Sequence, residues 1–227
     1  LTEMLEFHPS LPGVMKAVVK GDVVFEECNF YQFCTFSKKD GKSYIVEFSG
    51  DLVFDECLFR DTVDFSYTMV NGDFHAASSE FTGPTTFNNT WFKGRNNIFS
   101  HAVFYSKASF NDVMFDNRTR FFKTEFKEAA MFQSAAFKGH SFWGASTFEG
   151  YAEFGKTRFR DELDMGEASF RGRTNFNRMV CLLKARFNNT EFQESVDFSG
   201  ADFFLDPDFH GARFEAESDG VEDYHVE

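Results

Sequence analysis

Four cysteines and six histidines are the residues of this chain whose types could supply a nucleophile or bind a metal ion. They show no Cys-x-x-Cys, His-Glu-x-x-His or short Cys/His spacing of the kind that gathers metal ligands. The sequence therefore predicts no metal site and no cofactor, with a metal site or a disulfide kept as the alternative for the cysteines. The residues concerned are Cys28, Cys34, Cys57 and Cys181, and His8, His75, His101, His140, His210 and His225.

Paired carboxylates can act as a general acid and base only where burial or a neighbouring charge perturbs them. The pair Asp161-Glu162 lies in a polar stretch, and we expect it on a solvated face. The phosphate-binding Gly-x-x-x-x-Gly-Lys-Ser/Thr, dinucleotide-binding Gly-x-Gly-x-x-Gly and nucleophile-elbow Gly-x-Ser-x-Gly patterns are absent from the sequence. We therefore expect a chain that is not an enzyme and has no catalytic residues.

The net charge of −13 is distributed unevenly along the chain. Residues 1–90 hold 6 Lys and Arg against 14 Asp and Glu, residues 91–214 hold 17 against 16, and residues 215–227 hold 6 acids and no base. The acidity is thus at the two ends, and an acidic tail of this kind is typical of a solvated, disordered segment. Acidic residues also interrupt the arginines of the stretch 158–178, which argues against direct nucleic-acid binding.

The secondary structure that positions these residues follows from a sequence repeat. The repeat is visible as a ladder of regularly spaced bulky residues from position 110. Its intervals alternate between five and six without a break, and 17 of its 20 members are Phe. A helix is excluded, because a five-residue step turns by roughly 140° around a helix axis and would scatter the ladder over several faces. Short strands joined by turns satisfy the spacing, so we predict that the ladder is the structural core. Its members are Phe110, Phe115, Phe121, Phe126, Phe132, Phe137, Trp143, Phe148, Phe154, Phe159, Met165, Phe170, Phe176, Cys181, Phe187, Phe192, Phe198, Phe203, Phe209 and Phe214.

A second row of residues lies two positions before each ladder residue, and 15 of its 20 members are Ala, Ser or Thr. Large and small side chains in register are what a narrow core requires. Cys28, Cys34 and Cys57 fall in this small row and Cys181 in the ladder, so we predict four buried thiols. An interior filled in this way leaves no pocket for a substrate.

These rows resemble the repeats of a known family. A small residue, any residue and Phe recur at Ala-Glu-Phe 152–154, Ala-Ser-Phe 168–170, Ala-Arg-Phe 185–187, Ala-Asp-Phe 201–203 and Ala-Arg-Phe 212–214. The pattern resembles that of the pentapeptide-repeat proteins, and the alternation of five and six looks like their Phe-rich subgroup. The resemblance implies an all-β fold, a right-handed quadrilateral β-helix in which the bulky and the small residue both point inward.

Charge spacing predicts the length of one coil, because residues one coil apart lie about 4.8 Å from each other. At a separation of 22 within residues 91–214, eight charged pairs have opposite signs and two have like signs; the counts are four to four at 20 and nine to seven at 11. We therefore expect about nine coils of roughly 22 residues. The runs of alternating sign are Lys127–Glu149–Arg171, Glu162–Lys184–Asp206 and Asp164–Arg186–Asp208.

The regularity of the repeat divides the chain into four segments. Residues 1–13 are expected to be an N-terminal cap or linker, residues 14–98 irregular solenoid coils with loop insertions, residues 99–214 regular solenoid coils, and residues 215–227 an acidic, disordered tail. In the irregular part an insertion lies around residues 38–43, Ala76 stands where a Phe is expected, and one extra residue is expected near Gly94.

The leading functional expectation is a non-enzymatic structural or protein-binding solenoid that presents rigid flat faces to a macromolecular partner. The family resemblance suggests two alternatives, a DNA-mimic topoisomerase-binding protein of the quinolone-resistance type and a luminal or extracellular receptor domain. The near-neutral charge of the regular coils argues against the DNA mimic, because a rod that copies DNA carries acid along its faces. Ice binding is disfavoured, because most Thr residues fall in inward positions.

The expected partner is a protein of unknown identity, nucleic acid is disfavoured, and a homodimer through a solenoid end is a further expectation. No stretch approaches the roughly 18 apolar residues needed to span a bilayer, so no membrane span is expected in this chain. The sequence indicates a soluble protein in an unknown compartment, with the cytoplasm slightly favoured.

Overall fold

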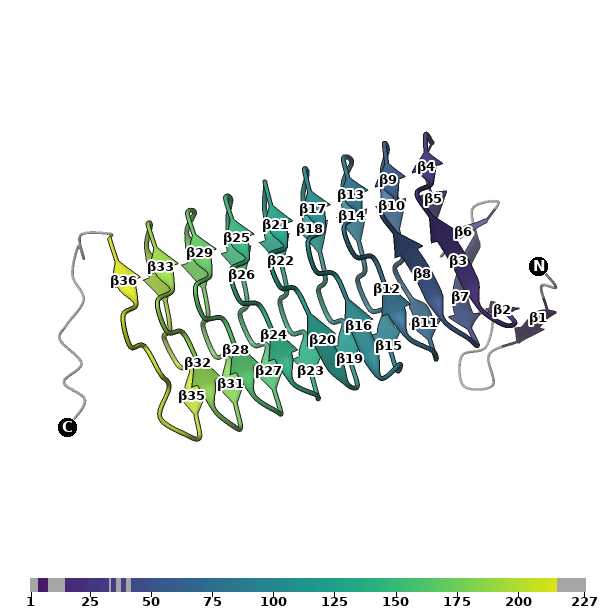
Figure 1. The fold of residues 1–227 in the computed structure, drawn as a ribbon. Coiled ribbons are helices and arrows are strands. Elements are labelled where there is room, and N and C mark those ends of the chain that lie inside the picture. The colour runs from purple at the N-terminus through teal and green to yellow at the C-terminus, as the bar shows by residue number, and fades with distance from the viewer. Residues whose placement is uncertain (1–3, 8–14, 33, 36–37, 40–41, 216–227) are drawn as a thin grey trace.

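The chain winds into a stack of coils with four sides, each side a β-sheet that runs along the stack (Figure 1). The computed structural model describes residues 4–7, 15–32, 34–35, 38–39 and 42–215. Within these residues there are 36 strands and no helix. The predicted all-β class and four-sided solenoid are confirmed. The first and last strands, β1 (Met4–Phe7) and β36 (Arg213–Phe214), lie at opposite ends of the stack.

Each coil contributes one short strand to each sheet, and we name the sheets A to D. Sheet A consists of β1 (Met4–Phe7), β2 (Met15–Val19), β7 (Lys42–Phe48), β11 (Thr68–Val70), β15 (Trp91–Phe92), β19 (Met114–Phe115), β23 (Ala136–Phe137), β27 (Arg158–Phe159), β31 (Val180–Cys181) and β35 (Asp202–Phe203), with β6 (Lys38–Lys39) paired to β7. Sheet B consists of β3 (Val23–Glu26), β8 (Leu52–Asp55), β12 (Phe74–His75), β16 (Asn96–Ile98), β20 (Arg118–Arg120), β24 (Ser141–Phe142), β28 (Leu163–Asp164) and β32 (Ala185–Arg186).

The other two sides are built in the same way. Sheet C consists of β4 (Asn29–Phe30), β9 (Leu58–Phe59), β13 (Glu80–Phe81), β17 (Val103–Phe104), β21 (Glu125–Phe126), β25 (Thr147–Phe148), β29 (Ser169–Phe170), β33 (Glu191–Phe192) and β36 (Arg213–Phe214). Sheet D consists of β5 (Cys34–Thr35), β10 (Val63–Asp64), β14 (Thr85–Thr86), β18 (Ala108–Ser109), β22 (Ala130–Met131), β26 (Ala152–Glu153), β30 (Thr174–Asn175) and β34 (Val196–Asp197).

Parallel pairing in the regular coils has a register of 22 residues, as charge spacing predicted. Ala130 pairs with Ala152, and Ala152 pairs with Thr174. Sheets B and D have eight strands and sheet C has nine, so the described chain makes about eight coils, close to the nine expected. Four of the eight opposite-sign pairs form ion pairs between neighbouring coils. They are Lys127–Glu149 (3.0 Å), Arg171–Glu149 (3.5 Å), Lys138–Asp116 (2.6 Å) and Arg213–Glu191 (3.2 Å).

Two of the expected charge runs are arranged differently. Glu162 pairs diagonally with Arg186, at 2.7 Å, and not with Lys184 directly beneath it. The Lys184 ammonium donates instead to the backbone carbonyl oxygen of Asp206, at 2.7 Å. Long side chains reach diagonal neighbours across a sheet as readily as direct ones, so an equal spacing in sequence does not identify the pair that forms.

The alternation of five and six residues reflects two kinds of corner. At each five-residue corner, between sheets B and C or D and A, the second residue after the ladder residue has a positive φ, for example 60° at Lys156 and 54° at Arg178. The amide of the following small-row residue donates to the ladder carbonyl three residues before it, as Thr157 does to Phe154 at 3.1 Å. This is the geometry of a type II turn, which needs a left-handed residue at its third position. Among the six-residue corners of the described residues, the first has such a residue, Gly21 with a φ of 81°, and the later ones have none.

Stacked rings fill the interior along each corner of the coils. The ladder residues of sheet C form one unbroken stack of nine Phe rings from Phe30 to Phe214, with neighbouring centroids 4.5–5.1 Å apart. The ladder residues that follow the sheet B strands face those that follow the sheet D strands across the interior. The rings of these two stacks meet edge to face, as Phe110 does with Phe121 at a centroid distance of 5.6 Å and an interplanar angle of 90°. Both arrangements are favourable for aromatic rings, so each ring contacts its own stack and the opposite one.

One coil exchanges the sizes of its two inward residues. Ala76 occupies the ladder position where a Phe was expected, and Phe74 occupies the small position beside it; both are buried. The Phe74 ring lies 5.0 Å from Phe99 and so fills the space that Ala76 leaves. Met179 and Cys181 are a second such exchange in which the ladder residue is the smaller one. The total side-chain volume of each layer of the core is therefore conserved, although the large and the small residue change places.

The N-terminal coils depart from the regular register at two places. Val23 pairs with Leu52, a separation of 29, because the segment that contains β6 is inserted in this coil. Val70 pairs with Phe92 at 22 but Phe74 pairs with Asn97 at 23, so one extra residue lies between positions 92 and 97, as expected near Gly94. A Cβ on Gly94 would lie 2.1 Å from the carbonyl oxygen of Gly72, so only glycine fits there.

We expect the double substitution Phe154→Asp and Phe176→Asp to unfold the coils that contain these residues. Both rings are fully buried and stack on each other at 5.2 Å, so the two carboxylates would lie unpaired in an apolar interior. The loss should exceed about 4 kcal/mol. Phe154→Leu with Phe176→Leu is the control and should cost about 1–2 kcal/mol at each site. Circular dichroism and urea unfolding measure both; an Asp variant that stays folded would show that these positions do not point inward.

Lys156→Gly should stabilise the protein by up to about 1 kcal/mol. Lys156 has a φ of 60°, which strains a residue with a Cβ and costs glycine nothing. Lys107→Gly is the matched control, because Lys107 is not among the positive-φ residues; there, glycine should destabilise by about 0.5–1 kcal/mol. Free energies of unfolding from urea titration decide the matter, and the same sign of change at both positions would contradict the strain at the five-residue corner.

Candidate functional site

The predicted core ladder occupies the interior. Its members from Phe110 to Phe192 are at most 1% exposed. Towards the C-terminal end Phe198, Phe203 and Phe209 are partly buried, and Phe214 is 53% exposed because no further coil among the described residues covers it. The placement of Phe214 therefore departs from the expectation of a buried ladder residue. The expected homodimer through a solenoid end stays a prediction.

The four cysteines are free thiols. Cys57 and Cys181 are buried, whereas Cys28 and Cys34 are partly buried, so the expectation of four buried thiols is met in full by two of them. Burial raises the pKa of the Cys181 thiol to about 12. Burial also raises the pKa of Cys57 and that of Cys34. Within the described residues no group of three or more His, Cys, Asp or Glu side chains could hold a metal ion.

The described histidines lie apart from one another on the outer faces. His140 is partly buried and stacks on the Phe142 ring at 3.7 Å. Burial lowers the pKa of His140 below its usual value despite nearby Glu162 and Asp161, which favours the neutral imidazole at neutral pH. His101 is exposed and lies edge-on to the Phe122 ring at 5.9 Å. His8 and His225 lie outside the described residues, as do the acidic positions of the predicted tail beyond Glu215.

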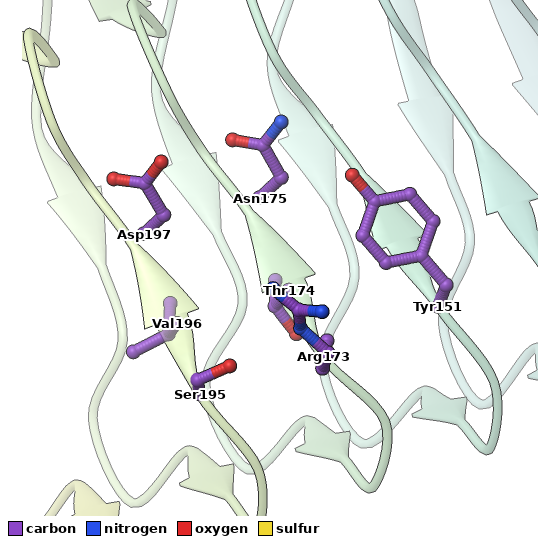
Figure 2. A pocket seen from close by; sticks show the side chains of 7 residues that line it. All are labelled: Tyr151, Arg173, Thr174, Asn175, Ser195, Val196 and Asp197. Carbon is purple, nitrogen blue, oxygen red and sulfur yellow. The ribbon is translucent and has the colours of Figure 1, made fainter. Parts of the chain in front are cut away.

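A shallow hollow of about 340 Å³ lies on the outer face of sheet D. Figure 2 shows three of its polar side chains in a row across neighbouring coils, the Tyr151 hydroxyl, the Asn175 amide and the Asp197 carboxylate. The complete lining is Tyr151, Arg173, Thr174, Asn175, Ser195, Val196 and Asp197. These groups can form hydrogen bonds with a ligand, but the lining has no cysteine or histidine, and no catalytic arrangement among its side chains is apparent.

A buried carboxylate holds the polar residues beside this hollow in place. Glu153 is 7% exposed, and its oxygens accept hydrogen bonds from the Gly155 amide at 2.6 Å and the Asn175 side chain at 3.0 Å. The Tyr151 hydroxyl donates to the same carboxylate. Burial and this bond raise the pKa of Tyr151, so the phenol stays protonated at neutral pH and is a donor. Glu153 therefore has a satisfied structural position, and sequence patterns had not singled it out.

A row of aspartates in the N-terminal coils also has a structural role. The Asp22 carboxylate accepts the amide of Asp51 at 2.9 Å, and the Asp51 carboxylate accepts the amide of Asp73 at 2.8 Å. The Asp73 carboxylate accepts both the amide and the side-chain nitrogen of Asn96, and these bonds lower the pKa of Asp73 against the effect of burial. Part of the acidity of the N-terminal half thus links one coil to the next.

Among the residues that the structure describes, no helix has the length and apolar character needed to cross a membrane. Four of their eleven exposed large apolar side chains lie at one corner near the C-terminal end, and the others are spread along the stack. Leu182 and Leu183 are 40% and 43% exposed, and Phe204 and Leu205, one coil further, are 68% and 49% exposed.

In the folded protein at pH 8, Ellman's reagent should titrate at most the two partly buried thiols, Cys28 and Cys34. Cys57 and Cys181 are each 1% exposed, and with a pKa of about 12 only about one Cys181 thiol in ten thousand is a thiolate at that pH. All four should react in denaturant, which is the control. Fast reaction of a third thiol in the native protein would mean that the small row is open to solvent at Cys57 or the ladder at Cys181.

No protein-family model, no curated protein and no solved structure matches this chain. Its function therefore has to be argued from its own residues, which are divided between a filled interior and four solvated faces.

Proposed function

We propose that this chain is a non-enzymatic solenoid that works as a structural or protein-binding module and presents rigid flat faces to a macromolecular partner. The filled interior carries the proposal. Stacked rings and small side chains take up the inward positions, so the chemistry left to the molecule lies on the outward residues of sheets A to D. Repeat solenoids in general bind through such extended surfaces.

The arrangement of the outward residues supports binding over catalysis. The hollow on sheet D is shallow, and its buried carboxylate is satisfied by neighbouring donors. Hydrogen bonds tie each coil to the next along all four sheets, as the parallel pairing of Ser109 with Met131 on sheet D illustrates. A face built in this way keeps its shape on contact, which lowers the entropic cost of binding a partner.

We also propose that the chain is a member of the pentapeptide-repeat proteins, in their Phe-rich subgroup. The coils of 22 residues, the four parallel sheets and the two inward rows support this membership. Membership would imply the right-handed winding of that family. It would not name a partner, because repeat proteins of one fold serve many functions.

Changing one face at a time tests the protein-binding function. Each variant adds negative charge at two exposed or partly buried outward positions of one sheet, where the interior is not disturbed. We expect quantitative affinity capture from native lysate to lose the same partner in one variant and to keep it in the other three, because a rigid module binds through one face. The variants are Arg158→Glu with Arg160→Glu on sheet A, Arg118→Glu with Arg120→Glu on sheet B, Ser169→Glu with Arg171→Glu on sheet C, and Arg173→Glu with Ser195→Glu on sheet D.

Equal thermal midpoints for the four variants are the control for folding. If all four capture the same proteins as the unchanged chain, or none does, binding is not specific to a face and the proposed function is wrong. The unfolded Phe154→Asp, Phe176→Asp variant marks the background of non-specific capture.

A further inference from the structure

Cations and aromatic rings lie together on sheet B and at its adjoining corner, in a surface that we name the basic–aromatic patch. It consists of Arg118, Arg120, Phe122 and Lys123 on one coil and Phe142 on the next. Strands β20 and β24 lie side by side and pair in parallel, so Arg118, Arg120 and Phe142 share the outer face of sheet B (Figure 1). Phe122 and Lys123 lie at the adjoining corner, where β20 has ended. Phe122 is 41% exposed, and the Phe142 ring is partly buried. Two outward Phe side chains thus lie close to a short run of three cations, two of which contact the rings.

The cations of this patch have no carboxylate partner. Among the described residues no Asp or Glu lies within 4.0 Å of the charged groups of Arg118, Arg120 or Lys123, whereas Lys127, Lys138, Arg171 and Arg186 all form ion pairs. Arg118 and Lys123 lie instead over aromatic rings, 5.9 Å from the centroid of Phe142 and 5.3 Å from that of Phe122. Each of these contacts contributes little at an exposed site, about 0.5–1 kcal/mol, so the guanidinium and ammonium groups remain available to an external anion.

The patch is bounded by acidic or uncharged residues along the stack. Phe142 pairs with Asp164 on the next coil, where Glu162 also lies. On the other side Arg118 pairs with Asn96, which is bonded to Asp73 of the coil before it. The positive surface is therefore about two coils wide, roughly the width of one extended chain.

The spacing across the sheet suits an extended peptide that crosses the stack in the direction of the strands. Arg118 and Arg120 are alternate residues of β20, and alternate residues of an extended peptide face the same side at the same interval of roughly 6.6 Å. Phe122 follows at the corner where the strand has ended. Two carboxylates at alternate positions of a peptide would meet the two arginines, and an apolar side chain further along the peptide would meet the Phe122 ring at the corner. Guanidinium groups bind carboxylates by short, charge-assisted hydrogen bonds, and an apolar side chain packs on the exposed ring.

We propose that the basic–aromatic patch is the docking site for an extended acidic segment of a partner protein, with carboxylates at positions i and i+2 on Arg118 and Arg120 and an apolar or aromatic residue at i+4 on Phe122. The segment lies parallel or antiparallel to β20, so the order can be reversed. This inference rests on the proposed protein-binding function and assigns it to sheet B and to a partner of stated chemistry.

Single-stranded nucleic acid is the competing occupant, since cations beside aromatic rings also bind bases and phosphates. The charge pattern favours the peptide. A nucleic acid follows a continuous row of cations, and here acidic residues stand on both sides of a patch two coils wide, on a protein with a net charge of −13. A segment that crosses the stack avoids these acids, whereas one that follows the stack meets them.

Fluorescence anisotropy with a labelled peptide of the sequence Gly-Ser-Asp-Ser-Asp-Ser-Phe-Ser-Gly tests the proposal. The unchanged protein should bind this peptide, and Arg118→Gln with Arg120→Gln should weaken binding at least about tenfold, because two charge-assisted hydrogen bonds are lost. Arg158→Gln with Arg160→Gln is the matched control: it removes two exposed arginines at the same spacing on sheet A and should leave binding unchanged. Phe122→Ser, which does not alter the charge, should weaken binding severalfold.

Several outcomes would overturn the inference. These are equal weakening by the sheet A control, equal binding of a scrambled peptide with adjacent Asp residues and Phe first, or tighter binding of an oligo-dT twelvemer than of the peptide. No measurable binding of the peptide to the folded protein overturns it as well. If the capture experiment then still finds a partner lost by a variant of another face, the protein-binding function holds and only its assignment to sheet B fails.

Discussion

The distance between hydrogen-bonded coils is the constraint on which the rest of the structure depends. Parallel strands lie about 4.8 Å apart, and rings in one row have centroids at nearly the same separation, for example 4.6 Å between Phe148 and Phe170. Offset-stacked aromatic rings are stable at this distance, so the backbone ladder and the side-chain stack reinforce each other at every coil. Because one coil cannot bury its own rings, stability comes from contacts between coils.

The corners follow from the same constraint. A coil has to turn four times within 22 residues and return in register, and two of its turns are shortened to five residues by a residue with positive φ. Buried hydroxyls support these corners, since Thr124 and Thr157 donate to the carbonyl oxygens of Phe99 and Phe132 in the preceding coil at 2.8 and 2.7 Å. The Thr, Ser and Ala of the small row are thus small enough to let the rings pass, and the hydroxyl members also satisfy carbonyl groups inside the core.

Charge spacing predicted the 22-residue register, and the resemblance to the pentapeptide-repeat proteins implied the four-sided fold. The period of the sequence was sufficient to predict the inward rows, because these follow from volume and spacing. It was not sufficient for the details that depend on two residues together. The exchange of Phe74 and Ala76 conserves the volume of a layer, which a position-by-position pattern records only as a missing Phe. The bond of Glu162 to Arg186 depends on the reach of side chains. The left-handed corner residues escaped notice because most of them are not glycine.

The sequence pattern predicted least about the outward residues. The physical reason for this also explains why these residues are informative about function. The repeat constrains inward positions through packing, and it constrains outward positions only weakly, since a solvated side chain affects stability little. An outward cation is therefore free to pair with a carboxylate one coil away, as Lys138 does with Asp116. Where Arg118, Arg120 and Lys123 have no such partner and lie beside exposed rings, fold stability does not account for the arrangement. The acidic segment that we propose as a partner would account for it, because its carboxylates would form charge-assisted hydrogen bonds with the guanidinium groups and an apolar side chain would cover the exposed ring.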